Sequence, residues 1–173
     1  HRWTLITAAL AVALMVALTA APPASAKVRQ PFRAIYTSQL KALVERNGLD
    51  PAQIDDVIMG CVMQVGAQSL NIGRNAVLSA GFPESVPSTT VDRQCGSSQQ
   101  SAHFAAQGVM AGAYDVVVAA GVEVMSMVPM GGHKVSINPW LIENYPDSYL
   151  SMGLTAERVA KHYGVKREEA DQF

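Results

Sequence analysis

The stretch STTVDRQCGSSQQSAHFAAQGVMAGAYDVVVAAGV, residues 88–122, decides the fold of this chain. Its first part, Ser88 to Arg93, predicts a strand, and residues 96–110 follow as a helix that Gly112 ends. Val116 to Val122 is so continuously apolar that we expect a strand covered on both faces. Strands that alternate with helices of this length predict an α/β fold with a mostly parallel sheet.

The same alternation continues on both sides of this stretch. Upstream, the apolar spacing and the turn residues predict two helices, a helical turn and a strand: Thr37 to Arg46, Asn71 to Ala80, the turn at Asp50-Pro51, and Val57 to Val65. Downstream, Ser126 to Ser151 loses periodicity, which is long for an idle loop and predicts a functional or oligomerising excursion. Helices are predicted again at Leu154 to Tyr163 and from Lys166 onward.

Residues 1–26 form a separate segment, and residues 27–173 form the predicted domain. Leu5 to Ala20 is uncharged and mostly apolar, and Ala24-Ser25-Ala26 follows as a small-residue pattern typical of a secretory cleavage site. The run is also long enough to span a bilayer, so an uncleaved membrane anchor is the alternative interpretation. Either interpretation predicts membrane contact, and favours a secreted or anchored protein.

The composition of the chain limits the classes of function that it can have. The 173 residues are 49% hydrophobic and 16% charged, which predicts one globular domain, and a net charge of −1 without a basic run argues against nucleic-acid binding. The two cysteines, Cys61 and Cys95, are too few for a disulfide framework or a zinc cluster, although one bridge between them stays open.

Cys95 is the candidate for chemistry because it lies where a strand turns into a helix. Backbone N–H groups and the helix dipole at that point favour a thiolate and can stabilise an oxyanion. Gly96 and the small serines after it let a substrate approach the backbone. The alternative is that Cys95 only fills space, which is our interpretation of Cys61 in its apolar segment.

Six motifs in order resemble the N-terminal half of a thiolase from Ala42 to Phe173. They are Gly48-Leu49-Asp50-Pro51, Asp56-Val57-Ile58-Met59-Gly60, Asn75-Ala76-Val77-Leu78, Val91-Asp92-Arg93-Gln94-Cys95-Gly96-Ser97-Ser98, Gly121-Val122-Glu123-Val124-Met125-Ser126 and Met152-Gly153-Leu154-Thr155-Ala156-Glu157. This resemblance implies a thiolase-like α/β fold with a mixed, mostly parallel sheet covered by helices.

The resemblance also implies roles for single residues. Cys95 would attack an acyl-CoA carbonyl, hold the acyl group as a thioester and contribute its backbone N–H to an oxyanion hole. Met152 would line the acyl and pantetheine pocket, and Glu123 would be a structural carboxylate behind the nucleophile. Coenzyme A thioesters would be substrates, with no further cofactor and no metal, and the full-length family implies a cytoplasmic homo-oligomer.

Departures from the family pattern separate this chain from a complete enzyme. Asp92, Ser98 and Ala120 stand where asparagine, glycine and glycine are usual, and the segment before Val28 is signal-like instead of a first strand. The family's second half supplies an oxyanion asparagine, a Gly-His-Pro histidine and a second cysteine, and these motifs do not occur here.

The histidines of this chain do not replace the missing ones. His103 is eight residues beyond Cys95, about 12 Å along a helix, which is too far for a base. We assign neither His133 nor His162 to catalysis. The prediction is therefore a thiolase-type acyltransferase whose isolated 173 residues are inactive. The alternatives are a non-catalytic exported or anchored fragment and, less favoured, a ketosynthase-like condensing enzyme.

Overall fold

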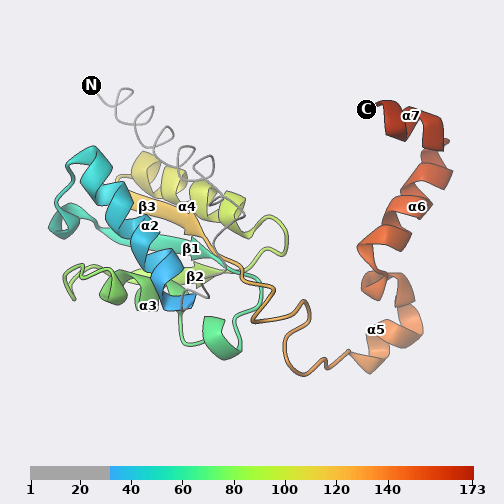
Figure 1. Cartoon of the computed structure of the whole chain (residues 1–173), viewed down its shortest axis with the longest axis horizontal. Helices are drawn as coiled ribbons and strands as arrows, with labels where there is room; N and C mark the ends of the chain where they lie inside the picture. The colour runs from blue at the N-terminus through green and yellow to red at the C-terminus, as the bar shows by residue number, and fades with distance from the viewer. Residues whose placement is uncertain (1–31) are drawn as a thin grey trace, which may run out of the picture. The chain divides into compact units, whose positions relative to one another are not determined.

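The computed structural model describes residues 32–173, which form two compact units. The first extends to His133, and the second comprises Lys134–Phe173. Figure 1 shows the sheet and its helices in the first unit, and the orange to red helices of the second. Each unit is described by itself. The predicted leader, residues 1–26, lies outside the described residues and stays a prediction.

A three-stranded parallel sheet forms the centre of the first unit. The strands are β1 (Asp56–Gly60), β2 (Ser88–Val91) and β3 (Val117–Gly121), in the order β2-β1-β3. Val57 pairs with Ser88 on one side and with Val118 on the other, both in parallel register. The predicted α/β class with a mostly parallel sheet is confirmed.

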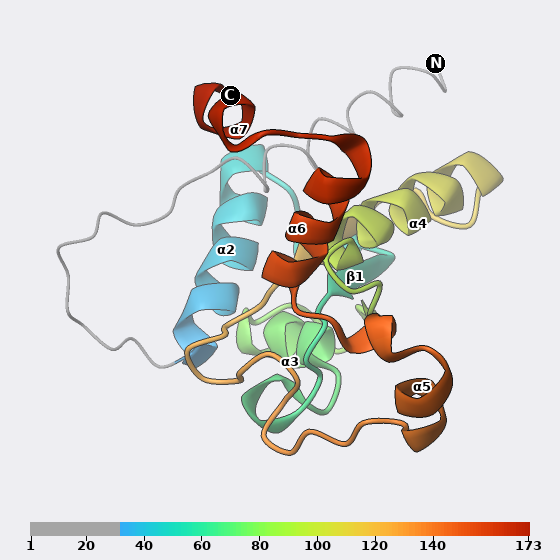
Figure 2. The same cartoon turned by 90° about the vertical axis from the view of Figure 1, so that its right-hand side faces the viewer.

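Helices cover both faces of this sheet. The helices α2 (Phe32–Asn47) and α3 (Ile72–Ser79) lie on one face, and α4 (Ser97–Ala111) lies on the other. Figure 2, turned by 90°, shows α2 and α4 on opposite sides of β1. The predicted covering of β3 on both faces is confirmed, because Val118 packs towards α2 and α3 while Ala119 packs towards α4.

The larger core lies between the sheet and the α2 and α3 helices. It contains apolar residues from all of these elements, including Leu40, Val57, Ile72, Val77 and Val118. Among the residues that the structure describes, the buried core cluster on the α4 side consists of Ile58, Ala105 and Ala119. The small alanines there allow α4 to approach the sheet closely.

The predicted end of the first strand was wrong. β1 ends at Gly60 instead of Val65, because Cys61 makes the last ladder bond, its N–H donating to Val91 O at 3.0 Å. After it the N–H groups of Val62 and Met63 turn to the Glu123 carboxylate. A distant side chain therefore ends the strand, which local hydrophobicity does not reveal.

The segment without periodicity, Ser126 to Ser151, was predicted as a functional or oligomerising excursion, and no helix was predicted within it. It contains the helix α5 (Pro139–Asn144) and the 3-10 turn η3 (Pro146–Tyr149). Asn138 caps α5 by accepting hydrogen bonds from the N–H groups of Trp140 and Leu141, and Pro139 fits the first turn. A helix this short shows no periodicity in sequence.

The remaining predicted elements are present, although α2 begins five residues before the predicted Thr37 and the turn η2 was not predicted. Pro51–Gln53 forms the 3-10 turn η1 behind the Asp50 cap, a second turn η2 comprises Gly66–Gln68, and the second unit continues with α6 (Met152–Tyr163) and α7 (Arg167–Gln172). Between residues 32 and 173 no helix is long and apolar enough to cross a membrane.

Candidate active site

Cys95 lies in the turn that joins β2 to α4. Its thiol is free and its side chain is exposed. Gly96 is the N-cap of α4, so Cys95 comes immediately before the helix begins. Gln94, the residue before Cys95, has a φ of 47°, in the left-handed region that non-glycine residues rarely adopt. The chain thus reverses sharply, and the reversal leaves the thiol at the surface.

Hydrogen bonds on both sides hold this reversal. The Gln94 N–H donates to Asp92 Oδ1 at 2.7 Å, and the Gln94 carbonyl accepts from Ser97 Oγ at 2.7 Å and from Ser97 N at 3.1 Å. Ser97 Oγ also accepts from Arg93 N at 3.0 Å, and Ser97 is 5% exposed. Both peptide groups of Gln94 are therefore bound by side chains of the same turn.

Two glycines let the first turn of α4 lie directly on the sheet. Gly60 and Gly121 end β1 and β3 and pair with each other in the parallel ladder. A Cβ on Gly60 would overlap the backbone of Ser97 and Ser98, and a Cβ on Gly121 would lie 2.5 Å from Ser98 Cβ. Any larger residue at either position would push the helix start away from the strand ends.

Ser101 anchors the next turn of α4. Its side chain is fully buried, and its hydroxyl lies 2.7 Å from Ser98 O and 2.9 Å from Ala120 O. Because one hydroxyl hydrogen serves two carbonyls, it ties the helix to β3 at the level of the glycines. The start of α4 is thus fixed by side-chain bonds as well as by packing.

Cys61 has the opposite environment to Cys95. It is 1% exposed, and burial raises the pKa of its thiol to about 11, with further contributions from the negative charges of Glu123 and Asp92. A thiol of this kind is not ionised near neutral pH. The interpretation of Cys61 as an inert buried residue agrees with this geometry, although Cys61 lies just after β1 instead of inside it.

A polar network centred on the buried Gln68 lies behind the strand ends, and it was not predicted from the sequence. Gln68 is fully buried, and its amide donates to Glu123 Oε1 at 2.7 Å and to Met63 O at 2.8 Å and accepts from Val124 N at 2.7 Å. Glu123 also accepts from Val62 N at 2.8 Å. The network ties the loop after β1 to the chain after β3, and it gives Glu123 a structural role. Nothing in the local pattern around Gln68 distinguishes it from a surface glutamine.

Met152 and the histidines considered in the sequence analysis lie outside the turn that contains Cys95. Met152 is the first residue of α6 in the second unit and is 64% exposed. His103 is exposed on α4 and His162 is exposed on α6. The His133 imidazole occupies the space beside Gly66, where its Nε2 would lie 2.5 Å from an added Cβ. Among residues 32–173 no group of three or more metal-binding side chains gathers.

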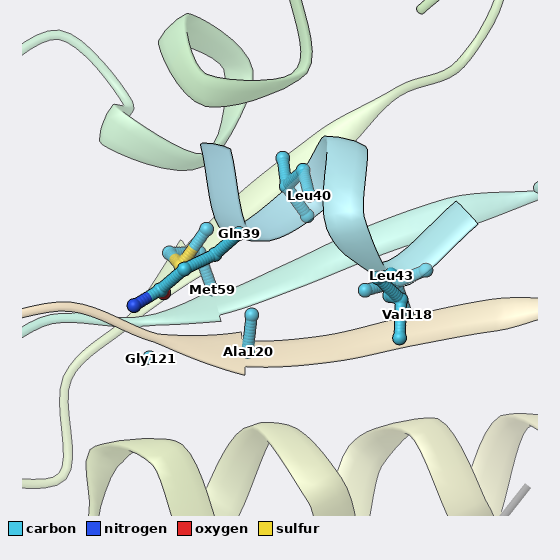
Figure 3. A pocket seen from close by; sticks show the side chains of 7 residues that line it. All are labelled: Gln39, Leu40, Leu43, Met59, Val118, Ala120 and Gly121. Carbon is cyan, nitrogen blue, oxygen red and sulfur yellow. The ribbon is translucent and has the colours of Figure 1, made fainter. Parts of the chain in front are cut away.

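A small cavity lies across the sheet from α4. Figure 3 shows its lining from α2, β1 and β3, with the Gln39 amide extending towards Gly121. Its volume is about 20 Å³, room for about one water molecule. A pocket for an organic ligand needs roughly 300 Å³ or more, so this cavity does not hold a substrate.

The fold and the turn define a class first: a parallel α/β unit that presents a free thiol at a strand-to-helix reversal. Comparison with known proteins then gives the family. Residues 24–173 match the thiolase N-terminal domain, and the chain belongs to the thiolase family. The matched range begins inside the predicted leader, two residues before its expected end.

Relatives with assigned names agree with this family. The chain is 48% identical over 134 residues to a 3-ketoacyl-CoA thiolase of Bacillus subtilis, covering 78% of this chain and 34% of that protein. It is 42% identical over 145 residues to a steroid 3-ketoacyl-CoA thiolase of Mycobacterium tuberculosis, covering 77% and 35%. The crystal structure of a Bacillus anthracis acetyl-CoA acetyltransferase superimposes with a TM-score of 0.63 at 35% identity, covering 80% of this chain and 37% of that one. The chain therefore spans about a third of the length of these relatives.

Proposed function

We propose that this chain carries the acyl-accepting nucleophile of a thiolase-type acyl-CoA acyltransferase, and that the nucleophile is Cys95. The sulfur of Cys95 attacks the thioester carbonyl of an acyl-CoA, the bond to the coenzyme A sulfur breaks, and coenzyme A leaves as a thiol after taking up a proton. The acyl group stays on Cys95 as a thioester, ready for attack by a second acyl-CoA carbanion or by coenzyme A.

One observation supports this proposal above the others. Cys95 is exposed just before α4, whose first turn packs directly on the sheet because residues 60 and 121 are glycines. The relatives in this family include proteins named 3-ketoacyl-CoA thiolase. Backbone N–H groups at such a helix start favour both the thiolate and the oxyanion of the tetrahedral intermediate. Met152 remains our candidate for contact with the acyl and pantetheine portions.

Acyl transfer to the protein tests the proposal. The 173-residue chain is incubated with acetyl-CoA, quenched with acid and digested, and acetylated peptides are mapped by mass spectrometry. We expect a hydroxylamine-sensitive acetyl group on Cys95 alone, lost in Cys95→Ser. Acetylation at Cys61 equal to that at Cys95, or none at Cys95 after long incubation at millimolar acetyl-CoA, would contradict the assignment.

A non-catalytic exported or anchored fragment is the second candidate, and the sequence of residues 1–26 favours it. Sequencing the mature N-terminus after expression in a secretion-competent cell separates the two. A start at Lys27 supports export. An intact product whose domain unfolds when residues 1–26 are deleted would show that the segment is structural. For the full-length family we propose a homo-oligomer.

A further inference from the structure

The turn before Cys95 contains a carboxylate whose role the nucleophile assignment does not explain. Asp92 is exposed, and its Oδ1 accepts a 2.7 Å hydrogen bond from the Gln94 N–H. The Asp92 charge also contributes to the raised pKa of the buried Cys61 thiol. The hydrogen bond from the Gln94 N–H is the contact that gives this side chain a role in the turn.

The role of Asp92 concerns the backbone conformation of Gln94. Its φ of 47° places a residue with a Cβ in the left-handed region, and such a conformation persists only where its surroundings hold it. Ser97 holds the carbonyl side of Gln94, and Asp92 holds the N–H side. If the N–H is released, the carbonyl-side bonds alone must resist relaxation of Gln94 towards negative φ. That relaxation would rotate the peptide between Gln94 and Cys95.

We propose that Asp92 is a positioning residue for Cys95: by binding the Gln94 N–H it holds the left-handed turn that presents the thiol at the start of α4. This inference rests on the proposed function, because it concerns the presentation of the same nucleophile. Asp92 acts through the backbone of Gln94 and touches no substrate. In this role the hydrogen-bond acceptor of Asp92 matters, and its charge does not.

Two variants separate the acceptor from the charge. Asp92→Asn removes the charge and keeps an oxygen acceptor in the same position, whereas Asp92→Ala removes both. The second-order rate of iodoacetamide alkylation at Cys95 is measured by mass spectrometry on the full chain, and Cys61 in the same sample reports any opening of the fold. A hydrogen bond in such a turn contributes enough to make Asp92→Ala about five-fold slower than Asp92→Asn.

A glycine at position 94 supplies the decisive control. Glycine adopts positive φ without steric cost, so Gln94→Gly makes the Asp92 bond dispensable. In the Gln94→Gly background we expect Asp92→Ala and Asp92→Asn to alkylate at equal rates. If Asp92→Ala alone loosens the fold enough to label Cys61, the added glycine should restore protection of Cys61.

The outcomes are distinct. Three results would each overturn the role of Asp92. The first is equal alkylation rates for Asp92→Ala and Asp92→Asn with Gln94 present, and the second is a five-fold difference that persists in the Gln94→Gly background. The third is labelling of Cys61 that Gln94→Gly does not reverse. A wild-type Cys95 that reacts no faster than the same residue in urea would overturn the nucleophile assignment itself, and this inference with it.

Discussion

Gly60 and Gly121 face each other across the β1–β3 pair, and both lie under the first turn of α4. The two glycines meet different parts of that turn. Gly60 lies against the backbone of Ser97 and Ser98, whereas Gly121 lies against the Ser98 side chain. Backbone cannot move away without shifting the whole helix, but a side chain can be removed by substitution.

This difference predicts the effects of alanine at the two positions. Gly60→Ala and Gly121→Ala should each lower the free energy of unfolding by about 1–3 kcal/mol, since both overpack a closed contact. Adding Ser98→Gly should restore most of the loss for Gly121→Ala and little for Gly60→Ala. Urea unfolding followed by circular dichroism measures all of these variants. Gly153→Ala in α6, where an added Cβ meets nothing within 4 Å, is the matched control and should not destabilise. Equal rescue at both positions would show that the helix start moves as a body.

The two cysteines should differ in reactivity across neutral pH. Cys61 is buried and its pKa is raised to about 11, so at pH 9 only about 1% of its thiol is ionised. Cys95 is exposed at a helix start. Between pH 6 and pH 9 we expect iodoacetamide to modify Cys95 at least about ten times faster than Cys61, with both sites mapped by mass spectrometry. Equal rates in the folded protein would end the nucleophile assignment.

Turnover should be absent or very slow in the 173-residue chain. His103 is exposed on α4, six residues and about 9 Å along the helix beyond its first residue, Ser97, so it does not reach the Cys95 thiol. Loss of the base that serves a cooperative nucleophile lowers kcat by several orders of magnitude. Thiolysis of acetoacetyl-CoA, followed by its ultraviolet absorbance with Cys95→Ser as control, measures this. A Cys95-dependent rate equal to that of a complete thiolase assayed alongside would refute the prediction.

Gln68 should be important for stability although it lies away from the thiol. Gln68→Leu leaves Glu123, the Met63 carbonyl and the Val124 N–H without their buried partner, and we expect a loss of about 2–4 kcal/mol. Gln68→Glu should cost more at pH 7, since it places a carboxylate against Glu123. Part of that loss should be recovered near pH 4, where a protonated carboxyl donates again. The exposed Gln107→Leu on α4 is the control, and urea midpoints at both pH values provide the measurement. A Gln68→Leu midpoint equal to that of the control would show that water satisfies the network.

Asp55, which lies just before β1, should make the free energy of unfolding depend on pH. Its Oδ2 accepts from Val116 N at 2.9 Å and from Asp115 N at 2.7 Å, and these bonds lower the pKa of the carboxyl below its ordinary 3.8. Because the folded pKa is lowered, the stabilisation is complete above the unfolded pKa and is lost as pH falls through the folded value. Asp55→Asn should therefore be less stable than wild type at pH 7, and the difference should shrink as the pH is lowered from 5 to below 3. A difference that is constant with pH would mean that the charge contributes nothing.

Local sequence was enough to predict the elements whose positions depend on neighbouring residues. The alternation of strands and helices, the Asp50 and Asn71 caps and the end of α4 at Gly112 agree with expectation, because caps, glycine stops and apolar spacing act within a few residues. The end of β1 was predicted wrongly because a distant group decided it. β1 ends early because Glu123, sixty-one residues after Val62, takes that residue's N–H.

The sequence by itself determined the α/β class, the thiolase resemblance and the place of Cys95 between a strand and a helix. Only the tertiary structure decided how that place is built: the left-handed Gln94, the glycine pair under α4, and the burial of Gln68 fifty-five residues before its partner Glu123. The physical reason is that these features depend on which strand ends meet. Two glycines or two polar side chains far apart in sequence carry no periodic signal, and they acquire their roles only when the parallel sheet brings its carboxyl ends together.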